Sequence, residues 1–557
     1  MQRTGILLIA VVSSVTLLLT PSIPLGVPGE WVWPRLALPE SLVELLDRLM
    51  FPFITAVGLV SLCRGVDAHI HRLSGLIRFL MLALLAAGSF CWINAVRQAA
   101  PSPHRELRPL WVLYDQFASG YFQEAAFRTT SQAELLSTYE TRMAEGDVLH
   151  EGTHPPGLFL LNWWAIQVTA KSETLTALAE WTQPSSTVRD FRKLEAEANM
   201  SRPLSRTEFA ALCLVSFVST LLAAMTVIPV FGIVCLIADS RIAWRAASLM
   251  LTVPTISVFA PRSDVVYAFS ATLLLWMLIA GWIALSPGVR WLCSLLAGAV
   301  AFVSLTISLA HLPVLVAGAA FAGLSLKGAD RPLLKQMMMS SLLMIGTFVV
   351  LCATWTLVTE CSLFSVWKMN LANHAAFYDQ SARTWWKWVF VNPAELAIAL
   401  GLPITVFCAY GFVRCLRMSG RFAGRPEKAV LPTVALADAR AAVSQNAVNL
   451  VLATTGTWVL LWLSGKNMGE SARLWCFLTP WFVMTGTFGL SLCQRMACNE
   501  EPSASPTAPS FTLRVSSSAT GIEGAHSQRD WLLLLIAQMV VCTITVGRVS
   551  GYLELWH

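Results

Sequence analysis

The sequence predicts an all-α, polytopic membrane protein with about 11–13 transmembrane helices and one large outer loop. Its 557 residues are 55% hydrophobic and only 13% charged, and the mean hydropathy is +0.61. A spanning helix needs about 20 apolar residues. The apolar runs here are continuous, whereas the strands of a membrane barrel alternate apolar and polar residues. Basic residues gather in short clusters between the runs, the pattern that sets topology in membrane proteins.

The chain begins with three predicted spans, at residues 6–19, 51–62 and 79–93. Arg3 precedes the first run and no small-residue cleavage site follows it, so we expect an uncleaved signal anchor with a cytoplasmic N-terminus. The basic cluster between Arg64 and Arg78 is also expected in the cytoplasm. The polar segment 97–152 should therefore lie on the outer side, with a short amphipathic helix on the membrane surface.

The remaining segments predict further spans that do not fit one alternating count. The apolar segment 158–168 either spans the membrane or only lies at its interface. The polar stretch 182–206 is rich in arginine and is expected in the cytoplasm, which would make this segment a span. Later spans are predicted at residues 209–238, 242–260, 265–284, 291–310, 312–326, 337–358, 396–415, 448–463, 475–492 and 531–546. At least one segment must therefore be re-entrant, half-length or misread.

The composition divides the chain into three parts. Residues 498–528 are rich in Ser, Thr, Ala and Pro, which predicts a disordered linker. Before the linker lies a multispanning membrane domain at 1–497, and after it a final span and tail at 529–557. We find no internal repeat and no sign of a separate soluble domain.

Charge and cysteine usage exclude several classes of function. The net charge of +6 comes from clusters between spans, so no nucleic-acid partner is expected. The 13 cysteines include no Cys-x-x-Cys pair and lie mostly in or beside apolar runs, which favours buried hydrophobic side chains over a metal centre. No motif requires a cofactor, and a divalent metal is an alternative only at the cluster described next.

The least common motif is the stretch 152–157, where His154 precedes two prolines and an apolar run follows directly. Each proline fixes its own backbone and keeps the preceding residue out of the helical region, which predicts a stiff corner where water meets lipid. An ionisable group held there is a candidate functional residue. Three more polar residues lie nearby: Asp147, His150 and Glu151. The cluster predicts either a metal or phosphate site, or a helix start capped by Asp147 or Thr153.

Two further pairs of candidates stand near the ends of apolar runs. In the outer loop, Asp115 and Tyr121 lie in an aromatic stretch, although a single surface aspartate is usually only solvated. At the end of a span, Arg262 and Asp264 could contact an anionic head group, or Arg262 could simply reach toward water.

The last candidates flank later spans. Lys466 and Arg473 predict a clamp for a phosphate or diphosphate, because arginine offers a bidentate fork and lysine a point charge. The alternative is that Glu470 pairs with Arg473 on one helix face. Trp385 belongs to an aromatic cluster that fits an interfacial belt or, less often, a platform for stacking sugar rings.

Together these motifs resemble the GT-C superfamily of membrane glycosyltransferases, in particular protein mannosyltransferases and the aminoarabinose transferase of lipid A. The resemblance rests on the order of Asp115, the His154-Pro-Pro corner, Arg262-Ser-Asp264 and the Gly-Glu-x-x-Arg-x-Trp run that contains Glu470 and Arg473. It implies a many-span helical fold that uses polyprenyl-linked sugars on its outer face. The chain departs from the family pattern because Asp115 has no second carboxylate beside it and three predicted spans precede the outer loop.

This resemblance implies an inverting transfer at the outer face of the cytoplasmic membrane, from a polyprenyl-phosphate sugar to a lipid, glycan or protein acceptor. Such a reaction needs a carboxylate that takes the acceptor proton, here Asp115. It also needs positive charge on the departing phosphate, from Arg473 with Lys466 or from Arg262. His154 would orient the donor phosphate or Asp115. The main alternative is a transporter or flippase for a lipid-linked or amphipathic solute; a glycan polymerase or ligase and a non-catalytic assembly protein also remain open.

Overall fold

The computed structural model describes residues 2–145, 150–197, 202–327, 329–380, 382–422, 445–499 and 519–551. Within these ranges the regular structure is helical, apart from one antiparallel pair of two-residue strands, β1 (Gly26–Val27) and β2 (Trp31–Val32). The predicted all-α class is confirmed.

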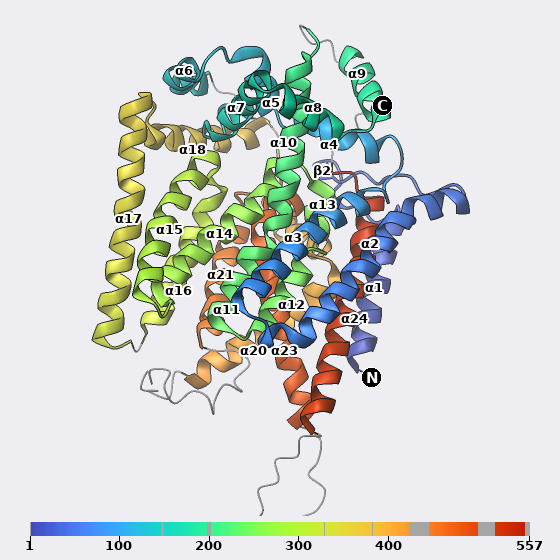
Figure 1. The fold of residues 1–557 in the computed structure, drawn as a ribbon, viewed down its shortest axis with the longest axis vertical. Helices are drawn as coiled ribbons and strands as arrows, with labels where there is room; N and C mark the ends of the chain where they lie inside the picture. The colour runs from blue at the N-terminus through green and yellow to red at the C-terminus, as the bar shows by residue number, and fades with distance from the viewer. Residues whose placement is uncertain are drawn as a thin grey trace, which may run out of the picture.

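One bundle of long helices makes up most of the molecule (Figure 1). Its helices are α1 (Gln2–Leu19), α2 (Leu42–His69), α3 (Gly75–Arg97), α10 (Arg206–Met225), α11 (Val227–Ile237), α12 (Ser240–Met250), α13 (Pro254–Phe259), α14 (Ser263–Ile283), α15 (Pro287–Ile307), α16 (Leu312–Leu326), α17 (Arg331–Thr359), α19 (Trp385–Leu400), α20 (Leu402–Phe422), α21 (Gln445–Leu463), α23 (Thr479–Asn499) and α24 (Ala519–Arg548). Four short turns of helix join them: η1 (Ile70–Arg72), η3 (Leu309–His311), α22 (Ser471–Leu474) and η4 (Cys476–Leu478).

The chain is an integral membrane protein. Ten helices in the described ranges are long and apolar enough to cross a membrane, and the pair α19–α20, bent by 115°, gives up to eleven. Helix α1 is apolar but shorter. The predicted span 396–415 therefore contains the bend, and the predicted span 242–260 is divided between α12 and α13. These breaks explain why the predicted spans did not fit one alternating count.

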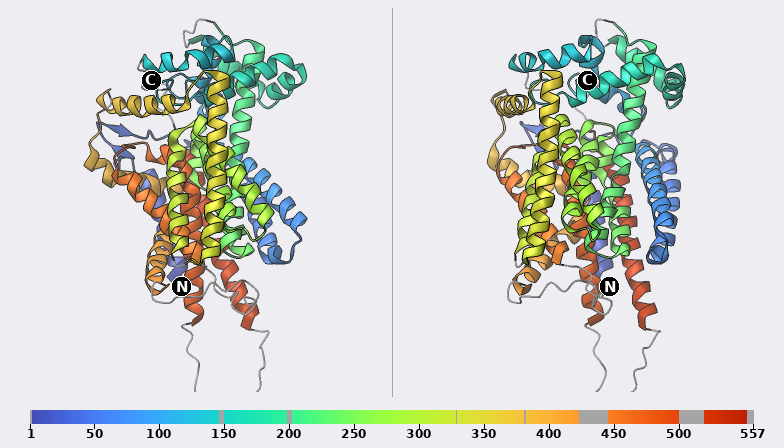
Figure 2. Two further views of the ribbon diagram at one scale, coloured as in Figure 1. Left: turned by 90° about the vertical axis from the view of Figure 1, so that its left-hand side faces the viewer. Right: turned by 60° about the vertical axis from the view of Figure 1, so that its left-hand side comes forward.

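A layer of shorter helices covers one end of the bundle (Figures 1 and 2). It contains α4 (His104–Tyr114), α5 (Tyr121–Gln123), the π-helical turn η2 (Glu124–Arg128), α6 (Gln132–Ala144), α7 (Gly157–Lys171), α8 (Glu173–Trp181), α9 (Ser185–Glu197) and α18 (Leu363–Gln380). We call it the outer layer. The N-terminus lies at the opposite end of the bundle (Figure 1).

The structure corrects the predicted place of residues 158–206. Segment 158–168 lies in α7, which is not among the spanning helices, and α9 packs against α4 in the outer layer. Segments 97–152 and 182–206 therefore lie at the same end of the bundle. The expectation that they face opposite sides of the membrane was wrong, and the loop does not end at residue 152. Charge bias sets topology only for short loops of up to about 60 residues, and the segment between α3 and α10 is longer. Its arginines pair with acids at this end of the bundle: Arg206 with Glu173 of α8 at 2.7 Å, and Arg202 with Glu208 of α10 at 2.7 Å.

The basic segment between Arg64 and Arg78, which joins α2 to α3, lies at the end of the bundle that carries the N-terminus (Figure 1). There Arg245 of α12 forms a buried bidentate ion pair with Asp67 of α2, at 2.8 and 3.0 Å. Trp244 donates to the carbonyl of Cys63 at 3.1 Å beside this pair. Removing one partner of a buried pair leaves an uncompensated charge, so these contacts fasten α2 to α12.

The predicted linker 498–528 is shorter than expected at both ends. Helix α23 continues to Asn499 and α24 begins at Ala519. Residues 500–518, and Asp147 in the outer layer, lie outside the described residues.

Candidate functional site

Most of the candidate residues meet where the outer layer rests on the bundle. Five segments contribute: the end of α4, helix α5, the corner before α7, the start of α14 and the short helix α22. We call this place the outer site.

The His154 corner is fixed by contacts on three sides. The carbonyl of Gly152 accepts from Asn370 at 3.1 Å and Asn373 at 3.0 Å, both on α18. The carbonyl of His154 accepts from the Tyr139 hydroxyl at 2.7 Å. A Cβ on Gly157 would lie 2.4 Å from the carbonyl oxygen of Thr306, so only glycine lets α7 begin this close to α15.

The alternative that the corner is only a capped helix start finds no support in the described residues. Pro156 precedes α7 and makes no side-chain cap bond there. The Thr153 hydroxyl lies 3.1 Å from Nδ1 of His154 instead. Asp147 cannot be judged because it lies outside the described residues.

His154 is held as a neutral imidazole. Burial, together with the nearby His150, lowers its pKa to about 3. Its ring contacts the Tyr121 ring edge-on, with centroids 5.3 Å apart. The charge of Asp264 raises the pKa of His154, and the charge of Arg473 lowers it. His154 can therefore donate or accept a hydrogen bond in the outer site but does not supply a positive charge.

Tyr121 is buried at the centre of the outer site. Its ring also contacts Phe159 at 5.2 Å. Burial raises the pKa of its hydroxyl well above the ordinary value, and Asp264 raises that pKa further while Arg473 and Arg262 oppose the rise. The phenol therefore remains protonated beside two arginines and a carboxylate, and it can act as a hydrogen-bond donor.

Four charged residues form a network across two helices. Arg473 Nη2 lies 2.5 Å from Glu470 Oε2, and its Nη1 lies 3.7 Å from Asp264 Oδ2. Arg262 Nε lies 4.0 Å from the same Asp264 oxygen. Burial alone would lower the pKa of Arg473, but Glu470 and Asp264 raise it above its ordinary value. The predicted pairing of Glu470 with Arg473 is thus present, and Arg473 also reaches Asp264 at the start of α14.

The backbone before Arg473 has an uncommon shape. Gly469 has φ +87° and Glu470 has φ +55°, so two successive residues are left-handed. A side chain on Gly469 would meet Arg383 at 2.3 Å and Trp388 at 3.2 Å. Left-handed non-glycine residues are rare and concentrate at functional sites. This turn aims the first residues of α22 at α14.

Asp115 ends α4 and is half-buried. Its Oδ2 accepts from the backbone N–H of Ala118 at 2.8 Å. Burial raises its pKa, while the Ala118 bond and the charge of Arg262 oppose the rise. Arg262 also donates to the carbonyl of Ala118, which fastens this turn to the start of α14. No hydrogen bond joins Asp115 to His154 within the described residues.

Two predicted site residues stand apart from the network. Lys466 is exposed. Burial, together with the charge of Lys466, lowers the pKa of His374. No ion pair or hydrogen bond in the described chain joins Lys466 to Arg473. Trp385 is 51% exposed and donates to the carbonyl of Leu463 at 3.3 Å. Its neighbour Trp388 is buried and donates to Glu30 at 2.8 Å. The exposure of Trp385 is compatible with both interpretations, the interfacial belt and the sugar platform.

One cluster was missed by the sequence analysis. Glu124, in the π-helical turn, lies 2.8 Å from Arg142, which also contacts Glu151 at 3.4 Å. Burial and the adjacent Glu151 raise the pKa of Glu124 to about 7. Glu124 follows Tyr121 by three residues, and Glu151 precedes His154 by three residues. This spacing was the only signal in the sequence for the cluster.

The residues present do not form a metal site in the described part of the chain. No group of three His, Cys, Asp or Glu side chains there could hold an ion. The described cysteines carry no disulfide.

The outer site therefore combines three half-buried carboxylates, a neutral imidazole, a phenol and two arginines between membrane helices. This set can accept a proton, donate hydrogen bonds and stabilise an anion. No protein-family model matches the sequence, and no curated protein matches it.

Proposed function

We propose that the chain is a membrane glycosyltransferase of the GT-C type. It would transfer a sugar from a polyprenyl phosphate to a lipid, glycan or protein acceptor at the outer face of the cytoplasmic membrane. One observation carries the proposal: Asp115, Tyr121, Arg262, Asp264 and Arg473 come from three distant parts of the sequence and meet at one end of a membrane bundle.

The orientation of the site follows from charge. The basic turn between α2 and α3 lies with the N-terminus at the end opposite the outer layer (Figure 1). Short loops rich in Lys and Arg are retained in the cytoplasm, so the outer layer and the site beneath it would face outward. A lipid-linked donor can reach such a site only from within the membrane plane, which accounts for a site built between spanning helices.

In the proposed reaction Asp115 removes the proton from the acceptor hydroxyl as its oxygen bonds to C1 of the sugar. The bond from C1 to the phosphate oxygen breaks with inversion, and its electron pair leaves with the polyprenyl phosphate. Burial favours Asp115 as a base because it raises the carboxyl pKa above that of a solvated aspartate.

The leaving phosphate is already charged, so it needs electrostatic stabilisation rather than an acid. Arg473 is the best-placed cation. Its Nε is buried and has no hydrogen-bond partner among the described residues, so one donor remains for a phosphate oxygen. Tyr121 and His154 are neutral donors at the same place and would orient the phosphate without adding charge.

The direct test is an assay of the protein in membrane vesicles with a panel of polyprenyl-phosphate sugars. The proposal predicts release of free polyprenyl phosphate and transfer of the sugar with at least one donor. Absence of release with every donor, in protein that is folded and correctly inserted, would contradict it.

A transporter or flippase is the second candidate, because the 115° bend between α19 and α20 resembles the broken helices that line transport sites. It predicts that a donor lipid crosses the bilayer unchanged. Release of the sugar from the lipid would separate the enzyme from the transporter.

A further inference from the structure

The short helix that carries Arg473 is held from behind by one buried carboxyl group. Glu395, in α19, is only 3% exposed. Its Oε2 accepts from the Ser471 hydroxyl at 2.9 Å and from the backbone N–H of Ala472 at 3.4 Å. A buried carboxyl group that accepts both a hydroxyl and a backbone donor fixes the position of the segment that donates them.

The turn of α19 before Glu395 holds the same loop. Asn392 donates to the carbonyl of Asn467 at 2.6 Å, and its own carbonyl accepts from the Ser471 hydroxyl at 3.1 Å. On the opposite side, Thr255 of α13 donates to the carbonyl of Ala472. The path of the chain into Arg473 is therefore set by α19 and α13 rather than by α22 itself, which has only four residues.

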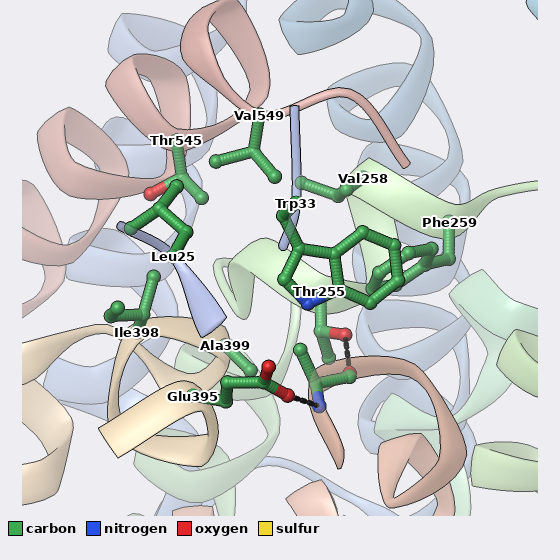
Figure 3. Close-up of a pocket in the computed structure, with 11 residues that line it drawn as sticks. Leu25, Trp33, Thr255, Val258, Phe259, Glu395, Ile398, Ala399, Thr545 and Val549 are labelled. Atoms are coloured by element: carbon green, nitrogen blue, oxygen red, sulfur yellow. Dashed lines mark hydrogen bonds between the residues drawn. The ribbon is translucent and has the colours of Figure 1, made fainter. Parts of the chain in front are cut away.

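The other oxygen of Glu395 faces a cavity. The cavity has a volume of about 30 Å³ and is mostly lined by apolar side chains from five separate parts of the chain. Figure 3 shows Trp33, Thr255 and Glu395 around the same space. Glu395 Oε1 and Trp33 Nε1 are both buried, and neither has a hydrogen-bond partner among the described residues.

Each of these two atoms lacks a hydrogen-bond partner of the kind that a water molecule supplies. A buried polar atom without a partner is costly, and a cavity needs about 10–15 Å³ to hold a water molecule. One water can accept from Trp33 Nε1–H and donate to Glu395 Oε1. The volume is too small for a lipid chain or a sugar, so neither is a reasonable occupant.

We infer that Glu395 is a positioning residue for Arg473, and that a water bound between Glu395 and Trp33 completes its hydrogen bonding. The placement of Arg473 against Asp264 then depends on α19, next to the bend of the broken helix. What Arg473 binds rests on the proposed function; the positioning itself does not.

The first test measures backbone hydrogen exchange in residues 465–478 of the full chain in detergent. Glu395→Ala should accelerate exchange there by about tenfold or more, because it removes an acceptor of two hydrogen bonds. Glu395→Gln should stay near the parent, since its carbonyl can face Ser471 while its amide donates to the water. Glu195→Ala is a matched control: that carboxyl is also buried and accepts a backbone N–H, from Leu204 at 2.7 Å, but in the outer layer.

Unchanged exchange in Glu395→Ala would overturn the inference, and so would equal acceleration in Glu195→Ala. If exchange in Glu395→Gln were as fast as in Glu395→Ala, a neutral acceptor at this position would not hold the segment, and the inference would be wrong on that point. A cryo-electron microscopy map that resolves ordered water should show density within hydrogen-bond distance of Glu395 Oε1 and Trp33 Nε1. Clear density for neighbouring waters but none at this point would exclude the bound water.

The second test measures binding of a polyprenyl phosphate, without sugar, to the protein in nanodiscs. At a temperature where all three proteins remain folded, Glu395→Ala should weaken binding by about tenfold, and Glu395→Gln should bind like the parent. Equal binding by all three proteins would overturn the link from Glu395 to Arg473. If the parent protein itself does not bind the probe, the proposed donor is wrong, and the exchange test still decides the role of Glu395.

Discussion

Arg473 and Asp264 are ion-paired across the outer end of the bundle, with Nη1 3.7 Å from Oδ2. The pair joins the short helix α22 to the start of α14, and Asp264 also lies 4.0 Å from Arg262. A single carboxylate thus sits between two arginines that are far apart in the sequence. Such an arrangement holds two cations close together, which an incoming anion can then contact.

Replacing Arg473 tests the phosphate contact. Arg473→Lys keeps the positive charge but exchanges a planar fork for a point charge. We expect the apparent KM for the donor to rise about tenfold in a protein of unchanged melting temperature. Steady-state kinetics with varied donor would measure this.

Glu470→Gln is the matched variant for this experiment, because Glu470 is the closest partner of Arg473, at 2.5 Å. Its effect on donor KM should be much smaller. If both variants lose similar stability and neither changes the donor KM, Arg473 serves only to fix the end of the helix.

The Glu124 cluster predicts how stability depends on pH. Burial and Glu151 raise the pKa of Glu124 from 4.5 to about 7. Between these values the folded protein binds more protons than the unfolded chain, so this group makes stability fall as the pH rises through that window. Glu124→Gln removes the titration. Its melting temperature relative to the parent should therefore increase between about pH 5 and about pH 8.

Glu134→Gln provides a control of opposite sign. Hydrogen bonds from Thr130 hold the pKa of Glu134 below its ordinary value, although burial opposes them. Its contribution to stability is present above the unfolded pKa and is lost as the pH falls. The deficit of Glu134→Gln should thus be largest at neutral pH. Parallel melting curves for Glu124→Gln and the parent across the window would contradict the assignment.

The structure changes the choice of residue for a topology experiment. Ser119 lies in the predicted outer loop but is only 5% exposed, whereas Phe117 in the same turn is 72% exposed. In a background without native cysteines, Phe117→Cys should react with a membrane-impermeant maleimide in intact cells. His71→Cys, exposed at the other end of the bundle, should react only after permeabilisation. The reverse pattern would place the outer site on the cytoplasmic face.

The fold class was predictable because it depends on composition and on the length of the apolar runs. The break at α19–α20 was not, since the two helices together are as apolar as an unbroken span. Residues 182–206 were misplaced because the charge rule fails for a long segment whose arginines pair with acids at the same end of the bundle.

In the candidate site, the sequence identified residues with unusual local surroundings, such as His154 and Arg473. It could not identify residues whose role comes only from tertiary contacts. Glu395 is one example, because nothing near it in the sequence indicates that it supports α22. Lys466 shows the converse: proximity to Arg473 in the sequence did not place the two side chains together.

The most direct measurement is sugar transfer by Asp115→Asn, compared with Asp190→Asn as a control in an exposed pair of the outer layer. Asparagine keeps an oxygen that can accept from Ala118 but cannot take a proton. With a donor that the parent protein uses, Asp115→Asn should reduce kcat by about 100-fold or more, while its melting temperature and the activity of Asp190→Asn remain unchanged. Transfer by Asp115→Asn at the rate of the parent protein would contradict the central claim that Asp115 is the base.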